Sequence, residues 1–183
     1  MVKVVGIVGM PGHGKTTTAK YLNKSLPNSE HFDIDKMMLT DYAKQHPDYK
    51  YVHGSGDFSK ITQESMPHVE AKLRSLIENN NDDESVYILE HTKLSESGIR
   101  NLIDLLVSVV AVSDYKAEQK RAARGGQEFD MERGRKRMAD IAIDFENCGQ
   151  DIIIYNDHEI ESIDKNVSLI LKALKNKLNK VGN

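Results

Sequence analysis

The 183-residue sequence has few of the features that mark secreted, zinc-binding or membrane-spanning proteins. Its single cysteine, Cys148, excludes an internal disulfide framework, and no group of cysteines and histidines has the spacing of zinc ligands. No apolar stretch approaches the roughly 20 residues that a helix needs to cross a bilayer. The apolar run after Met1 is too short for the apolar region of a signal peptide. We therefore expect a cytoplasmic protein that contacts no membrane.

A strong excess of charge is missing as well. The formal net charge is only −3, so the charge balance gives no general case for nucleic acid as a partner. Hydrophobic residues make up 39% of the chain, and a chain of this length buries roughly 70% of its unfolded surface on folding. These values predict one soluble domain with a full hydrophobic core.

Short apolar runs alternate with segments of helical periodicity. The runs are rich in β-branched residues and span 2–8, 31–34, 86–89, 106–112 and 152–155. Two of them are apolar almost throughout, as expected of strands covered on both faces of a parallel sheet. The helical segments span 15–25, 36–45, 61–79, 95–105, 114–124, 130–147 and 163–178. This alternation predicts an α/β domain with a doubly wound sheet of five parallel strands.

The segment GMPGHGKTTT begins at Gly9, after the first predicted strand and before the first predicted helix. Its pattern, Gly-x-x-x-x-Gly-Lys-Thr, is that of a phosphate-binding loop in the expected context. Glycines allow positive φ angles and bring backbone N–H groups against phosphate oxygens, and the following helix adds partial positive charge. Lys15 would contact the β and γ phosphates, and the Thr16 hydroxyl would ligate Mg²⁺. The residues expected to bind ATP here are Gly9, Pro11, Gly12, His13, Gly14, Lys15, Thr16 and Thr17.

Four classes of protein carry such a loop: small-molecule kinases, GTPase switches, transporter-type ATPases, and motor or DNA-processing ATPases. A GTPase is nearly excluded because the sequence has neither Asp-x-x-Gly nor Asn-Lys-x-Asp. A transporter-type ATPase is disfavoured because no strand with an acidic end soon follows ARGGQE at 123–128. A motor ATPase usually has a strand that ends in two acidic residues, whereas Glu90 ends its strand alone. The small-molecule kinase is favoured, and the motor class is the weaker alternative.

Two carboxylates support the kinase interpretation. Asp33-Ile34-Asp35 ends the second predicted strand, which we expect beside the point where the first strand enters the glycine loop. In a parallel sheet the carboxyl ends of the strands share one edge, where ligands bind. A carboxylate there can accept the proton of an acceptor hydroxyl or hold Mg²⁺ through water. Capping of the next helix is the alternative role, and the two roles are compatible.

A basic segment from 120 to 137 contains seven lysines and arginines. Mobile arginines on a closing lid stabilise the charge of a transferred phosphoryl group and exclude water. Gly125-Gly126 would end one helix and form the hinge of this lid. A solvated basic helix face is the alternative interpretation. Nucleic acid is an unlikely partner because no aromatic residues for base stacking are interleaved with the charges.

The chain resembles the dephospho-CoA kinase family, whose members phosphorylate the ribose 3′-hydroxyl of dephospho-coenzyme A in the last step of coenzyme A synthesis. Six segments match that family in order: GMPGHGKTT at 9–17, DID at 33–35, SMPHV at 65–69, TKLSESG at 92–98, VVAVSDYKAEQKRAARGG at 109–126 and DIIIYN at 151–156. The resemblance implies one P-loop kinase domain over 1–183. Its core would span 1–35 and 86–183, its acceptor-side helical region about 36–80, and its lid about 125–147.

The resemblance also implies roles for single residues. Lys15, Asp33 and Arg137 would be catalytic, with Asp33 as the base on the acceptor hydroxyl. Arg124 and Asn156 would contact ATP, and Asn156 would lie by the adenine. The residues implied in acceptor binding are Asp33, Asp35, His68 and Glu90.

The sequence departs from the family pattern in the parts that would contact the acceptor or the transferred phosphate. In the family an arginine usually follows the Asp-Ala-Asp segment closely, whereas Lys36-Met37-Met38-Leu39 follows here, and no arginine occurs between Asp35 and Met66. After the lid, Glu146 takes the place of a frequent arginine. A nucleoside or nucleoside monophosphate kinase of the same fold is therefore the alternative, and an ATP-binding regulator without small-molecule transfer is a third.

Overall fold

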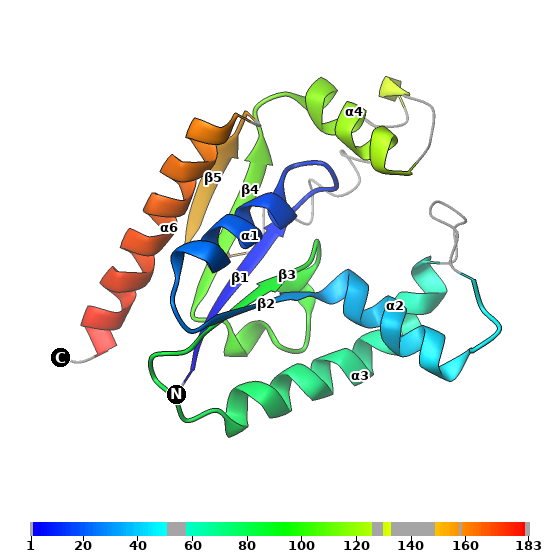
Figure 1. The fold of residues 1–183 in the computed structure, drawn as a ribbon, viewed down its shortest axis with the longest axis horizontal. Helices are drawn as coiled ribbons and strands as arrows, with labels where there is room; N and C mark the ends of the chain where they lie inside the picture. Colours follow the sequence, from blue (N-terminus) through cyan, green and yellow to red (C-terminus); the bar gives the residue numbers. More distant parts are fainter. Residues whose placement is uncertain (1, 51–57, 126–129, 133–148, 158, 182–183) are drawn as a thin grey trace.

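A parallel sheet forms the centre of the protein (Figure 1). The computed structural model describes residues 2–50, 58–125, 130–132, 149–157 and 159–181. Within them the strands are β1 Lys3–Gly9, β2 Ser29–Asp33, β3 Val86–Glu90, β4 Leu105–Ala111 and β5 Ile152–Asn156. All neighbouring strands are parallel, in the order β2-β3-β1-β4-β5. The predicted five-stranded parallel sheet is confirmed.

Helices cover both faces of this sheet. They are α1 Lys15–Ser25, α2 Ile34–Gln45, α3 Phe58–Asn79, α4 Asp114–Gly125 and α6 Ile160–Val181. Helix α1 packs beside α6, and α2 packs on α3 at the other side of the sheet (Figure 1). The helices predicted at 15–25, 36–45, 61–79, 114–124 and 163–178 are confirmed, with ends shifted by up to three residues. None of these described helices combines the length and the apolar character that crossing a bilayer requires.

Both faces of the central strand β1 are buried. Val4 and Val8 belong to the core beneath α2 and α3, whereas Val5 and Ile7 belong to the core beneath α1 and α6. Because successive side chains of a strand point to opposite faces, a strand between two helical layers needs apolar residues at nearly every position. This requirement explains the continuous apolar run before the glycine loop.

Strand β3, and not β2, lies beside β1. We expected Asp33 next to the point where β1 enters the loop, but the sheet register pairs Glu90 of β3 with both Asp33 and Ile7. Glu90 therefore stands between Asp33 and the central strand, and the expected adjacency of β2 and β1 is wrong. The carboxyl ends of β2, β3 and β1 nevertheless lie at the same edge of the sheet, which is the edge where the glycine loop begins.

The helix predicted at 95–105 is wrong. Two short 3₁₀ turns, Leu94–Glu96 and Arg100–Leu102, occupy this segment, and Leu105 already begins β4. Gly98 separates the two turns and is held against α3, because its N–H donates to the Glu70 carboxylate at 2.8 Å. Its carbonyl accepts from the Arg74 guanidinium at 2.7 Å. These contacts fix the backbone in a shape that a continuous helix would not allow.

The edge strand β5 is joined to β4 and α6 by one carboxylate. Asp151 accepts from the Leu106 N–H at 2.8 Å and lies 2.7 Å from the Lys177 ammonium of α6. Burial by itself raises the pKa of Asp151, but the Lys177 ammonium and the Leu106 N–H outweigh it and hold the pKa below its usual value. The carboxylate thus stays charged and fixes β5, whose last residue is Asn156, in register with β4.

Candidate active site

The glycine loop has the backbone conformation that its sequence predicts. Gly12 and Gly14 have φ angles of +89° and +97°, values that side chains disfavour. Gly9 closes β1, and a Cβ on it would lie 2.6 Å from the Val109 carbonyl oxygen. Lys15 opens α1 and is largely buried, with its ammonium donating to the Met10 carbonyl at 3.2 Å. The loop therefore places Lys15 at the first turn of α1, with its ammonium turned back to the loop backbone.

Side chains tie this loop to β4 and β5. The His13 Nδ1–H donates to the Val109 carbonyl at 3.2 Å, and the Asn156 amide donates to the His13 carbonyl at 2.7 Å. Asn156 is only 1% exposed, so its amide is committed to the loop backbone. The structure thus gives both residues a role in shaping the loop, and direct contact of either with ATP stays a prediction.

On the other side of the loop, Thr16, Glu90 and His31 form a partly buried chain of hydrogen bonds. The Thr16 hydroxyl donates to Glu90 Oε1 at 2.5 Å, and His31 Nε2 donates to Glu90 Oε2 at 3.0 Å. Glu90 is 5% exposed, and both of its oxygens are engaged. Because the Thr16 hydrogen points to Glu90, the lone pairs of the Thr16 oxygen face away from that carboxylate. This is the orientation that a hydroxyl needs to ligate a cation.

The residues present fit a magnesium ion bound together with a nucleotide. Mg²⁺ keeps several waters and takes one or two protein oxygens together with phosphate oxygens. Thr16 supplies the protein oxygen, and Glu90 supplies a buried negative charge directly behind it. Among the described residues, no group of three or more His, Cys, Asp and Glu side chains is arranged to hold a metal ion by itself. Such a site would therefore depend on the phosphates.

Asp33 and Asp35 have different environments. Asp33 caps α2, because its Oδ1 accepts from the Lys36 N–H at 3.2 Å. Asp35 lies 3.3 Å from Nε2 of His91, which is 5% exposed. The His91 Nδ1 accepts from the Lys93 N–H, so in the neutral ring Nε2 carries the hydrogen and donates to Asp35. The cap that the sequence suggested is present, and the role of Asp33 as a base stays a prediction.

The remaining predicted site residues lie elsewhere. His68 is on α3, where its Nδ1 lies 3.1 Å from the Asp41 carboxylate of α2, so it does not join the carboxylates at the strand ends. Arg124 belongs to the last turn of α4, and the position of its side chain is not described. Arg137, like the predicted lid at 125–147 and the predicted helix at 130–147, lies outside the described residues apart from Gly125 and 130–132.

Two histidines of the site were not predicted from the sequence. His31 precedes Asp33 by two residues, which places both on one face of β2, and His91 directly follows Glu90. Their proximity to acidic residues was a usable signal, but isolated histidines are common in proteins without such a role. The pairings His31–Glu90 and His91–Asp35 join segments 59 and 56 residues apart in the chain.

Replacing Gly12 with alanine should destabilise the fold more than a positive φ angle alone would. A Cβ on Gly12 would lie 2.3 Å from the Ala117 carbonyl oxygen, so the loop or α4 must move. Gly149 is the matched control, since its φ is +59° and no described atom lies within 4 Å of a Cβ there. We expect Gly149→Ala to cost about 1 kcal/mol, the usual penalty for this conformation, and Gly12→Ala clearly more. Thermal unfolding measures both, and equal melting temperatures for the two variants would contradict the close contact.

Comparison with known proteins supports the fold. No protein-family model matches the sequence, and no curated protein matches it. The crystal structure of TT1252 from Thermus thermophilus superposes with a TM-score of 0.65 at 17% identity, covering 94% of this chain and 98% of that one. Shikimate kinase from Bacteroides thetaiotaomicron superposes with a TM-score of 0.59 at 16% identity, with the same coverage of 94% and 98%. The chain therefore shares its overall α/β fold with these two proteins.

Proposed function

We propose that the protein is an ATP-dependent small-molecule kinase that transfers the γ-phosphate of ATP to the 3′-hydroxyl of dephospho-CoA. One observation carries this proposal: the glycine loop, the Thr16–Glu90 pair and the carboxylates of Asp33 and Asp35 lie along a single edge of the sheet. The fold shared with shikimate kinase supports a small-molecule acceptor. The ordered segments that resemble dephospho-CoA kinase support the choice of acceptor.

We assign binding of the phosphate donor, ATP, to the glycine loop. Phosphoryl transfer needs positioning and neutralisation of charge more than covalent chemistry by the protein. Backbone N–H groups of the loop and of the first turn of α1 would bind the phosphates, and the Lys15 ammonium would leave the Met10 carbonyl for the β and γ oxygens. Thr16, backed by Glu90, would hold Mg²⁺, which neutralises negative charge on the phosphates when bound.

We assign activation of the acceptor hydroxyl to the carboxylates at the strand ends. The acceptor oxygen forms a bond to the γ-phosphorus while the bond from that phosphorus to the β–γ bridging oxygen breaks. The hydroxyl proton passes to a carboxylate, and we assign this task to Asp33. Asp35 lies two residues further and is fixed by His91. The lid arginines, Arg137 foremost, would stabilise the charge on the transferred group.

A panel of acceptors tests this proposal. We expect dephospho-CoA to stimulate ADP release from Mg²⁺-ATP and to gain one phosphate, detected by mass spectrometry of the product. Nucleosides, nucleoside monophosphates and shikimate serve as comparison acceptors. Stimulation by a nucleoside or a monophosphate instead would favour a nucleoside or nucleotide kinase of the same fold. ATP binding without stimulation by any acceptor would favour a nucleotide-binding regulator.

A further inference from the structure

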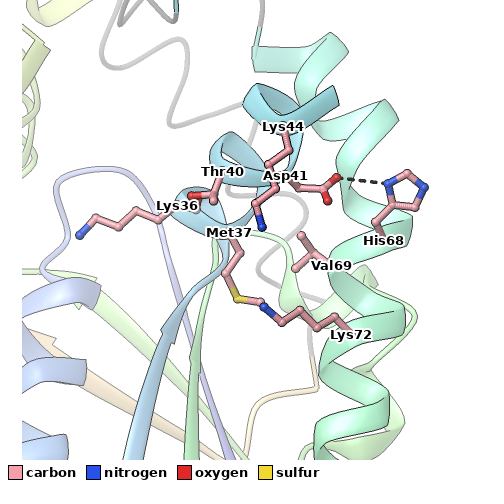
Figure 2. A pocket seen from close by; sticks show the side chains of 8 residues that line it. All are labelled: Lys36, Met37, Thr40, Asp41, Lys44, His68, Val69 and Lys72. Atoms are coloured by element: carbon pink, nitrogen blue, oxygen red, sulfur yellow. Dashed lines mark hydrogen bonds and ion pairs between the residues drawn. The ribbon is translucent and has the colours of Figure 1, made fainter. Parts of the chain in front are cut away.

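A groove of about 220 Å³ lies between α2 and α3, on the acceptor side of the sheet (Figure 2). Its walls are formed by α2 residues between Lys36 and Lys44 and by His68, Val69 and Lys72 of α3. Met37 and Val69 supply apolar surface within it. One end adjoins the candidate active site, because the N–H of Lys36 is bonded to the Asp33 carboxylate.

The groove carries positive charge that the described part of the chain does not neutralise. Lys36, Lys44 and Lys72 are exposed, and within the described residues none of their ammonium groups has an ion pair or a hydrogen bond. Asp41 is the one carboxylate among the described lining residues. Its Oδ2 is 2.6 Å from Gln45 Nε2 and 3.1 Å from His68 Nδ1, so it is engaged away from the lysines.

The side-chain directions agree with this separation of Asp41 from the lysines. In Figure 2 the Asp41 carboxylate points toward His68, while Lys44 and Lys72 extend toward Met37 from the two helices. Lys36 extends to the opposite side. Two cations from separate helices above an apolar floor are suited to an anionic group attached to an organic molecule, and lysine ammonium groups are common phosphate ligands.

The groove extends from the helix start that Asp33 caps to the Lys44 and Lys72 ammonium groups near Met37. A ligand with its hydroxyl at Asp33 and an anionic group at these two ammonium groups would therefore lie across Met37. The segment between Asp35 and Met66 contains no arginine, so lysines are the cations available on α2 for this task.

We propose that Lys44 and Lys72 bind a phosphate or diphosphate group of the acceptor. The identity of the ligand as the acceptor rests on the proposed kinase function, whereas the anion site rests on the groove itself.

The test compares two double variants that remove the same charge. Lys44→Ala combined with Lys72→Ala removes from the groove the two lysines proposed to bind the anion. Lys172→Ala combined with Lys175→Ala removes two exposed lysines from α6, on the opposite layer of the fold (Figure 1). By calorimetric titration we expect dephospho-CoA to bind the first variant about 10- to 100-fold more weakly than the unmodified protein, the scale for one or two hydrogen bonds to charged groups. The control should bind within about twofold.

Steady-state kinetics and a second probe separate the outcomes. A raised KM for dephospho-CoA with kcat retained at saturation supports the inference, because the lysines would bind the acceptor without touching the reacting atoms. Inorganic diphosphate is titrated in a Lys15→Ala background, which weakens binding at the glycine loop. If diphosphate binding depends on Lys44 and Lys72 while dephospho-CoA binding does not, the groove binds a free anion and the acceptor assignment is overturned.

Two further outcomes complete the test. If the groove variant and the α6 control bind both probes equally well, the groove is not an anion site and the inference is wrong. If dephospho-CoA binds through Lys44 and Lys72 but receives no phosphate from ATP, the groove inference holds and the proposed kinase function fails. The two proposals can therefore fail independently.

Discussion

Lys15→Ala is expected to lower the rate of phosphoryl transfer by a factor on the order of 10² or more, the scale for losing one donor that stabilises developing charge. Lys15 is held at the start of α1 with 9% of its surface exposed, and its ammonium already lies within the loop, 3.2 Å from the Met10 carbonyl. In the proposed reaction this ammonium would leave the Met10 carbonyl and contact the β and γ phosphates. The measurement is kcat with Mg²⁺-ATP and the best acceptor of the panel.

Lys20 provides the control for this prediction. It lies on the same helix five residues further, is exposed, and has no ion pair or hydrogen bond with the described residues. Lys20→Ala should leave kcat unchanged, and circular dichroism should show that both variants keep their helical content. An unchanged kcat for Lys15→Ala would remove the catalytic role of the glycine loop from the proposal.

Asp33→Asn is expected to reduce transfer by a factor on the order of 10² to 10⁴, the range for loss of a general base. The structure makes this substitution unusually informative. Asp33 Oδ1 caps α2 by accepting from the Lys36 N–H, and asparagine caps helices as well as aspartate does. The variant therefore keeps the helix start and loses the basic oxygen. ATP affinity, measured by titration with the nucleotide, should stay the same.

Asp35→Asn is the companion variant, because Asp35 lies two residues away and is held by His91 rather than by the helix backbone. If Asp33 is the base, Asp35→Asn should have the smaller effect on kcat. A larger loss in Asp35→Asn would assign the proton transfer to Asp35. Loss of ATP binding in Asp33→Asn would instead indicate that Asp33 serves the metal or the structure of the site.

The strands and most helices were predictable because their signals are local. The apolar run before Gly9 needs two buried faces, and the loop pattern fixes the start of α1 at Lys15. The failure at 95–105 has a tertiary cause, since Gly98 is bound by Glu70 and Arg74 of α3. No local pattern reports that contact. The position of β3 between β2 and β1 is likewise a property of the sheet, because pairing order cannot be read from the strands one at a time.

In the candidate site, too, the residues of the local motif were predictable, whereas their partners from distant segments were predictable only in part. The loop residues were predictable because one continuous motif carries the backbone conformation, the cation and the hydroxyl. The partners of that motif were only partly predictable, since Glu90 reaches Thr16 across 74 residues and His31 reaches Glu90 across 59. The proposed role of Lys44 and Lys72 was not predicted, because nothing in the sequence distinguishes them from the other lysines of the chain. Only the packing of α2 on α3 gives them a shared groove.

Hydrogen bonds connect the glycine loop to strands on both sides of β1. His13 and Asn156 connect it to β4 and β5, and Thr16 connects it through Glu90 to β3 and, through His31, to β2. A free glycine-rich segment would lose about 1–2 kcal/mol of conformational entropy per residue when it closed around phosphate. Here that loss belongs to folding and not to binding. The loop is preorganised, so if it binds a nucleotide as proposed, little of the free energy of the phosphate contacts would be lost to ordering the backbone.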